Sequence, residues 1–378
     1  MIALSEPNLS GNEWKYIKEC LDTNWVSSVG KFVNEFEAAV ARYCGAKYAV
    51  ATSNGTTALH LGLLLAGVKP GELVLAPNIT FVASINAIKY VQADPVLIDV
   101  DSSTWQMDLD LLEQFLKNEC EQKNGRCFHT VSGRIVSAIM PVHVLGNIGD
   151  MDRLMKITHA NNLKMVEDST EALGSYFRGK HAGTFGEMGC LSFNGNKIIT
   201  TGGGGMLITD DEGLAKKAKH LSTQAKADAN EYYHDEVAYN YRLVNVLAAM
   251  GVAQMEQLPS FIKRKKEISS YYNNQFKLIP GICSQKIPES VDSNHWLYTI
   301  KVPRQKELRK FLRDKGVDAR PFWVPMNRLP AFRENIYYTS NDVSSAVYND
   351  CLSLPCSTHI TNEQLETVAG LVNEFYHD

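Results

Sequence analysis

Residues 166–205 read VEDSTEALGSYFRGKHAGTFGEMGCLSFNGNKIITTGGGG, and they contain two candidate catalytic residues. A largely apolar run at 163–166 leads into Asp168, and a second apolar run at 189–193 is followed by Lys197. Short apolar runs between glycines and polar residues are typical of buried strands. The two expected strands therefore deliver an acid and a lysine from their carboxyl ends, where open α/β sheets hold their ligands.

Lys197 and Asp168 suit the two ends of one cofactor, pyridoxal 5'-phosphate. A lysine among apolar strand ends has its ammonium pKa lowered by desolvation, so it can attack an aldehyde and form a Schiff base. A carboxylate beside the ring nitrogen keeps that nitrogen protonated, so that the ring accepts electrons. Each residue also has an ordinary interpretation, because lysines in glycine-rich loops are usually solvated and an aspartate after a strand often caps a helix.

Seven strands are expected in the first two thirds of the chain, and helical segments lie between them. They begin near residues 48, 73, 95, 135, 163, 189 and 205. This alternation predicts an α/β fold with a mixed, mostly parallel sheet between helix layers. Beyond Pro280, a strand, a helix, a strand and a C-terminal helix indicate a smaller α/β domain. We expect a large cofactor-binding domain at 1–250, with the N-terminal segment, and a small C-terminal domain at 251–378.

The composition limits the classes of partner. The 378 residues are 44% hydrophobic, which is enough for two cores, and the formal charge of −4 argues against nucleic acid or an anionic membrane as partner. Eight cysteines lack CxxC spacing, so no metal site is expected. The N-terminus does not resemble a signal peptide, and the most apolar window, 59–68, is too short to span a bilayer. A cytoplasmic protein with reduced cysteines is expected.

The segment 52–58, TSNGTTA, lies between an expected strand and an apolar helical pattern. The unpaired N–H groups of such a helix start bind phosphate, and nearby hydroxyls add to the binding. The same small polar residues are also good helix caps, so this pattern alone leaves both interpretations open.

Motifs along nearly the whole chain resemble the nucleotide-sugar aminotransferases of the DegT type, which belong to aspartate aminotransferase fold type I. The likeness is carried by EDSTEALGS at 167–175, by LSFNGNK at 191–197 and by the glycines that follow, and it extends from residue 7 to CLSLP at 351–355. The resemblance implies dependence on pyridoxal 5'-phosphate, with Lys197 bound covalently to the cofactor. Related sugar 3-dehydratases carry histidine at this position, so the lysine favours amino transfer.

The resemblance also implies which residues hold the cofactor phosphate. These are Gly55, Thr56 and Thr57 in the SNGTTAL turn, Ser192, and Asn240 of the NYR motif, which reaches into the site of the partner subunit. A homodimer with shared active sites is therefore expected.

Two further cofactor contacts follow from the same comparison of motifs, and one histidine is a candidate from its place in the sequence. The resemblance places Phe81 flat on the pyridine ring, although an aromatic residue there could equally belong to the core. Glu171 stands where many relatives have glutamine, and its carboxylate would repel the phenolate oxygen of the cofactor unless it were protonated or oriented otherwise. His143, at the end of a strand, is either catalytic or structural, and we favour the structural role.

Three residues near the expected small domain are candidates for substrate binding. The guanidinium of Arg320, in DARPF at 318–322, suits paired oxygens, either of the glutamate carboxylate or of a nucleotide diphosphate. His295 and Trp296 could line the nucleotide side. Each of the three is equally compatible with a structural role.

The expected reaction transfers the amino group of L-glutamate to a nucleotide-linked ketosugar, with Lys197 as the base that moves the proton. The segments 9–30, 192–205 and 318–322 most resemble the subgroup that aminates C4 of UDP-4-keto-6-deoxy-N-acetylglucosamine. The alternatives are a C3 aminotransferase of a dTDP- or UDP-linked 3-keto sugar and a non-catalytic regulator that binds pyridoxal phosphate. A desulfurase or aldolase is disfavoured, because no cysteine lies in a recognisable mobile loop.

Overall fold

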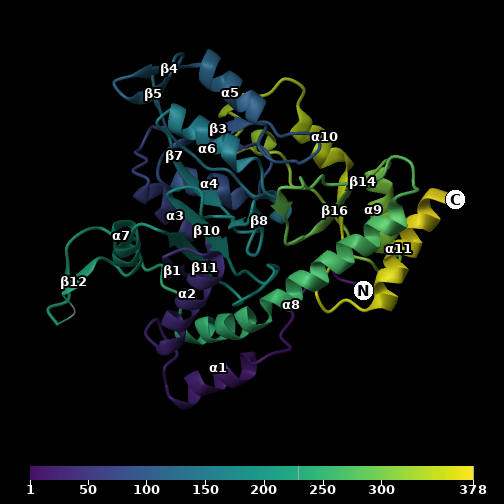
Figure 1. The fold of residues 1–378 in the computed structure, drawn as a ribbon, viewed down its shortest axis with the longest axis horizontal. Helices are drawn as coiled ribbons and strands as arrows, with labels where there is room; N and C mark the ends of the chain where they lie inside the picture. The colour runs from purple at the N-terminus through teal and green to yellow at the C-terminus, as the bar shows by residue number, and fades with distance from the viewer. Residues whose placement is uncertain (229, 378) are drawn as a thin grey trace.

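A large twisted sheet forms the centre of the protein in a computed structural model that describes residues 1–228 and 230–377 (Figure 1). Within the described residues the sheet has ten strands. Eight follow one another in the order β1 (Tyr48–Thr52), β11 (Gly205–Thr209), β10 (Met188–Ser192), β7 (Lys164–Asp168), β6 (Ile135–Ile139), β2 (Leu73–Pro77), β3 (Asp94–Ile98) and β18 (Ile336–Tyr338). The hairpin of β4 (Cys120–Lys123) and β5 (Arg126–His129) pairs with β6.

The direction of the strands confirms the predicted mixed, mostly parallel sheet. Strands β10, β7, β6, β2, β3 and β18 pair in parallel, whereas β11 runs antiparallel to both β10 and β1. All seven expected strands are present, and β18 and the β4–β5 hairpin are additional. Gly205 at the start of β11 is paired with Ser192 and with Thr52, so the ends of β10 and β1 lie on either side of it.

Helices cover both faces of the sheet. On one face, Val74 and Ala76 of β2 pack in a core with α3 (Gly55–Leu65), α4 (Val82–Tyr90) and α7 (Glu212–Ser222). On the other face, Leu73 and Leu75 pack with α5 (Leu109–Asn118) and α6 (Met151–Ala160), while α2 (Lys31–Cys44) and α8 (Asn245–Phe276) cover β10 and β11. Alternate residues of a strand point to opposite faces, so the apolar run of β2 is buried on both sides.

Side-chain caps fix where several of these helices begin. Asn54, Asp108, Asp150 and Asp211 precede α3, α5, α6 and α7, and each side chain accepts a backbone N–H bond from the first turn of its helix. Such caps satisfy donors that have no partner within the helix. In α3 the cap leaves the helix start at the carboxyl end of β1.

A second, smaller core lies toward the C-terminus. It contains the later part of α8 together with α9 (Gln305–Asp314), α11 (Asn362–His377), β16 (Tyr298–Lys301) and β19 (Cys351–Leu354). Beside β16 and β19 lie the short strands β14 (Cys283–Ser284) and β17 (Arg320–Pro321). The proposed division between residues 250 and 251 falls inside α8, which spans both cores (Figure 1).

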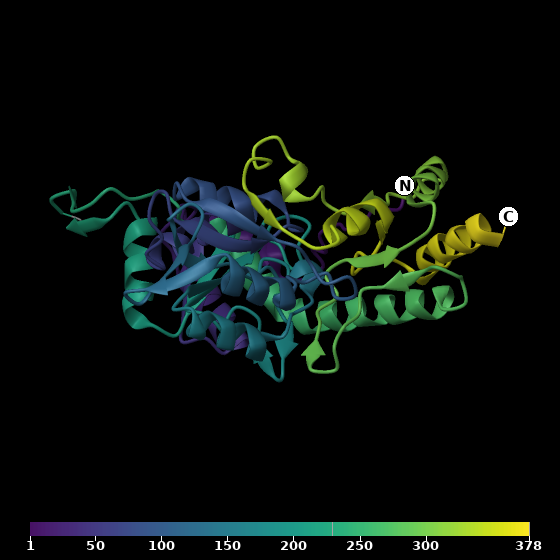
Figure 2. The same cartoon turned by 90° about the horizontal axis from the view of Figure 1, so that it is seen from above.

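One segment departs from the expected domain division. Strand β18 and the preceding residues Met326 and Phe332 pack on the large sheet, although they follow the start of the small core in the chain. Figure 2 shows this yellow-green segment against the blue strands of the large sheet. Helix α10 (Val343–Asp350) then leads back to β19. The C-terminal part of the chain therefore contributes to both cores.

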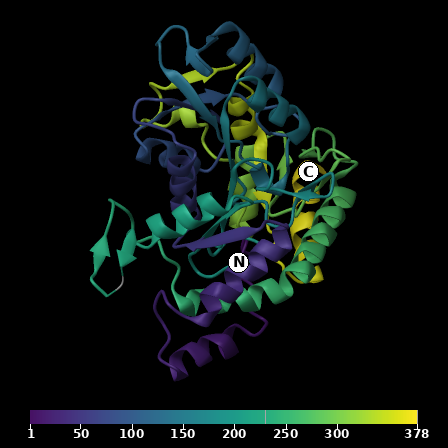
Figure 3. The same cartoon turned by 60° about the vertical axis from the view of Figure 1, so that its left-hand side comes forward.

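The remaining elements are peripheral. They are α1 (Glu13–Asp22), the three-stranded sheet of β15 (Val291–Asp292), β8 (Tyr176–Phe177) and β9 (Lys180–His181), and the hairpin of β12 (Lys226–Asp228) and β13 (Tyr233–His234). This last hairpin projects away from the rest of the molecule (Figures 1 and 3). Across residues 1–228 and 230–377 we find no helix with the length and apolar character of a membrane span.

Candidate active site

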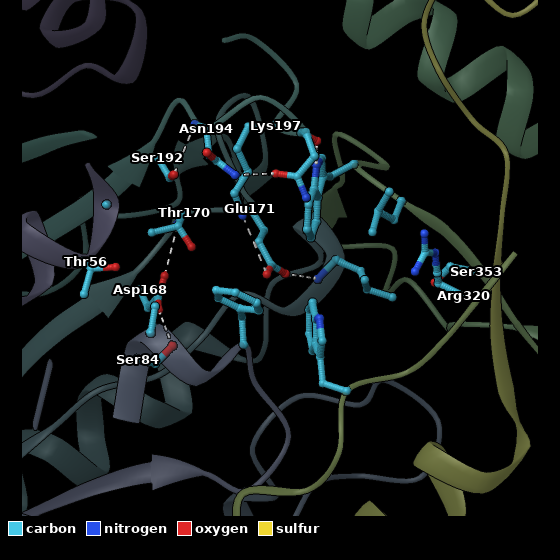
Figure 4. A pocket seen from close by; sticks show the side chains of 18 of the residues that line it. Thr56, Ser84, Asp168, Thr170, Glu171, Ser192, Asn194, Lys197, Arg320 and Ser353 are labelled. Carbon is cyan, nitrogen blue, oxygen red and sulfur yellow. Dashed lines mark hydrogen bonds and ion pairs between the residues drawn. The ribbon is translucent and has the colours of Figure 1, made fainter. Parts of the chain in front are cut away.

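A cavity of about 500 Å³ lies where the carboxyl ends of β7 and β10 face the small C-terminal core. Figure 4 shows Thr56 and Ser192 at one end of this cavity and Arg320 and Ser353 at the other, with Lys197 between them. The cavity therefore combines strand ends of the large sheet with residues of the C-terminal region, and it holds most of the site residues expected from the sequence.

The amine of Lys197 points into the cavity from the loop after β10 (Figure 4). Its Nζ lies 3.9 Å from Oε1 of Glu171 and 4.1 Å from the centre of the Trp296 ring. Burial lowers the pKa of Lys197, and the nearby carboxylates of Glu171 and Asp168 oppose this shift. A larger share of the side chain is therefore present as free amine than for a solvated lysine.

Asp168 is the last residue of β7, and two donors fix its carboxylate. Oδ2 accepts a hydrogen bond of 2.6 Å from the Ser84 hydroxyl, and Oδ1 accepts one of 3.1 Å from the Thr170 backbone N–H. The Ser84 hydroxyl also lies 2.7 Å from that of Thr80. An aspartate held in this way presents its carboxylate to the cavity in one orientation.

Glu171 is buried beside the lysine. Its Oε2 accepts a hydrogen bond of 2.8 Å from the backbone N–H of Leu145, a residue with the left-handed backbone angle φ of 61°. Burial raises the pKa of Glu171 to about 7, while the charge of Lys197 and the hydrogen bond from Leu145 oppose this rise. At neutral pH a substantial fraction of this carboxyl group is protonated, as the sequence-based argument about repulsion requires.

The start of α3 forms the other end of the cavity, where Gly55 and Thr56 line its wall beside Ser192. A Cβ atom on Gly55 would lie 2.8 Å from Cβ of Ser192, so only glycine allows this close approach. Thr57 does not line the cavity, because its N–H and hydroxyl bond to Asn54 and complete the helix cap. Free N–H groups at a helix start beside two hydroxyls suit a phosphate group.

Aromatic side chains form a wall opposite the carboxylates. Phe81 lines the cavity and is 53% exposed, so it is a surface residue of the cavity rather than a core residue. The Trp323 ring centre is 6.5 Å from that of Phe81 and also 6.5 Å from that of Trp296, to which it is nearly parallel. The Trp296 indole N–H donates a bond of 2.7 Å to the carbonyl of Asn196. Trp296 is thus fixed against the loop that carries the lysine.

Besides Thr57, two candidates from the sequence do not reach this cavity in the single chain. Asn240 is exposed and lies outside it. His295, whose backbone has the left-handed angle φ of 50°, lines a separate, small cavity, and its substrate contact stays a prediction. Burial lowers the pKa of His295 to about 4.

His143 also lies outside the cavity, in a buried pair with Glu167. The His143 ring nitrogen Nε2 is 2.9 Å from Oε2 of Glu167. Glu167 in turn accepts backbone N–H bonds from Gly183, Phe185 and Gly186, so the pair joins the end of β7 to the segment before β10. This arrangement fits the structural role that the sequence favoured.

Arg320 lies at the far end of the cavity on β17, where it pairs with Ser353 of β19. Its side chain is 65% exposed, and Nε donates a hydrogen bond of 2.8 Å to Asp318. The guanidinium is therefore accessible to an anionic ligand that enters the cavity.

Sequence reasoning missed several cavity residues. Ser84, which holds Asp168, sits in the first turn of α4, and Trp323 follows the RPF motif by one position. A hydroxyl soon after a strand end was a usable signal for Ser84. No local pattern indicates that Trp323 meets Phe81, because this contact joins distant segments.

Comparisons with known proteins give a consistent result. The profile of the DegT/DnrJ/EryC1/StrS aminotransferase family matches residues 7–373. The chain is 37% identical to GDP-perosamine synthase of Escherichia coli O157:H7, covering 100% of this chain and 99% of that protein. It is 35% identical to the putative pyridoxal phosphate-dependent aminotransferase EpsN of Bacillus subtilis strain 168, covering 100% and 96%. The crystal structure of the aminotransferase TlmJ from Streptoalloteichus hindustanus matches with a TM-score of 0.89 at 27% identity, covering 99% of this chain and 98% of that one.

Proposed function

The chain belongs to the DegT/DnrJ/EryC1/StrS aminotransferase family of pyridoxal phosphate-dependent sugar aminotransferases, and on that basis we propose that it transfers the amino group of L-glutamate to C4 of a nucleotide-linked 4-keto-6-deoxy sugar. The observation that carries this proposal is the buried amine of Lys197, which points into a cavity between the carboxyl groups of Asp168 and Glu171. Because the family is one of aminotransferases, membership in it argues against the alternative of a non-catalytic regulator.

The residues of the cavity fit the cofactor at each of its polar groups. The start of α3 with Gly55 and Thr56, together with Ser192, would hold the phosphate. Asp168 would hold the ring nitrogen, Phe81 would pack on the ring, and Lys197 would bind the aldehyde. Bound in this site, pyridoxal phosphate supplies an electron-accepting ring that makes amino transfer possible.

Lys197 is proposed as the general base and acid of both half-reactions. Its Nζ accepts the α-proton of the amino donor, and in the opposite half-reaction it donates a proton to the keto carbon of the sugar. The lowered pKa increases the share of unprotonated amine, which favours this role. Trp296 holds the loop of the lysine in place through its bond to Asn196.

We propose that Asp168 and Glu171 each hydrogen-bond to the cofactor, Asp168 at the ring nitrogen and Glu171 at the phenolic oxygen. The fixed Asp168 carboxylate accepts a hydrogen bond from the protonated ring nitrogen. Protonated Glu171, with its Oε2 bound by Leu145, presents Oε1 as a possible donor to the phenolic oxygen of the cofactor. In this form glutamate can serve in place of the glutamine found in many relatives.

The substrate is proposed from the relatives and from the motifs together. The full-length relative GDP-perosamine synthase supports amination of C4, because perosamine is a 4-amino-4,6-dideoxy sugar, and it makes a GDP-linked 4-keto-6-deoxyhexose the first candidate. UDP-4-keto-6-deoxy-N-acetylglucosamine, which the motifs at 9–30 and 192–205 indicate, is the second. Amination of C3 remains the alternative that product analysis must separate from both.

We also propose that the protein forms a homodimer in which the two subunits share their active sites. Asn240 lies outside the cavity of its own chain and is exposed, as a residue that serves the partner subunit would be. The eight free cysteines fit the proposed cytoplasmic location, where thiols stay reduced.

The test uses two separate measurements. Purified holoenzyme is first mixed with L-glutamate alone, and we expect the absorbance of the bound cofactor to change to that of the amine form. The glutamate-treated enzyme is then given a panel of GDP-, UDP- and dTDP-linked 4-keto- and 3-keto sugars. We expect a 4-amino product, identified by mass and by NMR. A change with glutamate but no 4-amino product from any sugar of the panel would overturn the C4 assignment.

A further inference from the structure

A second cavity of about 500 Å³ adjoins the active-site cavity at the C-terminal region. Arg320 and Pro321 line both cavities, so the two share one wall. The new cavity is also lined by Arg309, Arg313 and Asp318. We refer to Arg309, Arg313, Asp318 and Arg320 as the arginine groove.

The local fold explains why these side chains come together. Arg309 and Arg313 lie one turn apart on α9, so they share a face of the helix. After α9 the chain turns back, with the Val317 N–H bound to the Leu312 carbonyl at 2.9 Å, and it enters β17 at Arg320. The groove therefore joins a helix face directly to the strand at the mouth of the active site.

The groove carries an excess of positive charge. Its one acid, Asp318, is engaged by Arg320 through two hydrogen bonds of 2.8 and 3.3 Å. Among the residues that the structure describes, no ion pair is recorded for Arg309 or Arg313. Two guanidinium groups thus have no compensating carboxylate, and their planar forks suit paired phosphate oxygens.

Two neighbouring ion pairs at α9 lie outside the groove. Lys310 binds Asp314 at 2.5 Å, and Arg304 binds Glu307 at 2.8 Å.

We propose that the arginine groove binds the nucleoside diphosphate of the substrate while its sugar enters the active-site cavity past Arg320. This inference rests on the proposed function, in which the substrate is a nucleotide sugar. Such a molecule has two parts, a sugar and a nucleoside diphosphate. The sugar must reach Lys197, and the diphosphate that follows it carries negative charges that need partners outside the cofactor cavity. The shared wall at Arg320 connects the two sites in this order. L-glutamate has no such extension and does not need the groove.

The test compares the double variant Arg309→Gln/Arg313→Gln with Lys310→Gln, a matched control that removes a charge from the same helix but outside the groove. The dissociation constants of GDP, UDP, GMP, guanosine and pyrophosphate are measured on the holoenzyme. For the diphosphates we expect an increase of about tenfold or more in the double variant and little change in the control. The KM of the nucleotide ketosugar should rise by a similar factor with little change in kcat. Guanosine, which lacks phosphate, should bind equally to all forms.

The outcomes separate this inference from the proposed function. Normal turnover of a nucleotide ketosugar with unchanged diphosphate binding in the double variant would overturn the groove and leave the function intact. Loss of diphosphate binding in the double variant would support the groove. If the wild-type enzyme at the same time turned over no ketosugar of the panel, the proposed substrate would be overturned. A raised KM for L-glutamate with unchanged diphosphate binding would assign the arginines to the amino donor and overturn the groove. If the double variant melts at a lower temperature than wild type, the single variants Arg309→Gln and Arg313→Gln provide the same comparison.

Discussion

The two carboxyl groups whose charges act on Lys197 are held in different ways. Asp168 is bonded to the Ser84 hydroxyl, whereas Glu171 is bonded through one oxygen to a backbone N–H and has its other oxygen 3.9 Å from the lysine amine. Burial raises the pKa of Glu171 to about 7, so its charge changes within the range in which the enzyme is assayed. The proton affinity of Lys197 should therefore depend on the state of Glu171.

The variant Glu171→Gln tests this dependence in cofactor-free protein. Above pH 7 the carboxylate of the wild type is charged and raises the pKa of Lys197, so its removal should lower that pKa and leave more free amine. We expect Lys197 to react with an amine-directed reagent roughly tenfold faster or more in the variant above pH 7. The measurement is the labelling rate of the Lys197 peptide as a function of pH.

The pH dependence of the effect supplies an internal control. Below pH 7, Glu171 is protonated and uncharged in the wild type, so the labelling rates of the two proteins should approach each other. Equal rates at every pH would show that the carboxyl group does not influence the amine.

At the scale of secondary structure, β11 and the start of α3 are in very close contact. A Cβ atom on Gly205 would lie 2.4 Å from the backbone carbonyl carbon of Asn54, the residue that caps α3. Gly205 is the last residue of the four-glycine run at 202–205. Because it has no side chain, the start of α3 can lie against β11, and this contact sets the position of the proposed phosphate site.

The substitution Gly205→Ala should displace the start of α3. We expect a loss of about 1–3 kcal/mol in the free energy of unfolding, because the added methyl group overlaps backbone atoms, together with weaker binding of pyridoxal phosphate. Gly203→Ala is the matched control, since a Cβ atom there meets nothing within 4 Å. Thermal unfolding and cofactor titration measure the two effects, and equal behaviour of both variants would contradict the proposed role of the contact.

The sequence predicted those elements whose signal is local. The seven long strands of the sheet were found because buried parallel strands read as continuous apolar runs. Strand β18 was missed, since its three residues, IYY, gain their conformation by pairing with β3. Lys197 and Asp168 could be identified from motifs, whereas nothing local in the sequence indicates that His295 lines a separate cavity. Trp323 depends on contacts between distant segments.

At the scale of the whole molecule, large apolar side chains are exposed on the N-terminal segment. Trp14, Trp25 and Val29, in and after α1, are 74%, 55% and 65% exposed. Exposed apolar side chains mark an interaction surface where they lie together, and Trp25 and Val29 line one cavity. This surface supports the proposed dimer, in which Asn240 of each chain would serve the site of the other.

Mixing two inactive variants tests the shared site. In a dimer of one Lys197→Ala chain and one Asn240→Ala chain, one site carries both substitutions and the other carries neither. After random exchange of subunits at equal concentrations, we expect activity to recover to about a quarter of the wild-type value. Each variant incubated alone serves as the control. No recovery, despite proven subunit exchange, would place Asn240 in the site of its own chain.

Strand β18 matters while the chain is still being synthesised. It pairs with β3, which without it would present a row of open backbone donors and acceptors at the margin of the sheet. During synthesis this margin stays uncovered until Ile336–Tyr338 has left the ribosome, long after β3 itself. A nascent or truncated chain is therefore exposed to aggregation through that margin until residues 336–338 pair with β3.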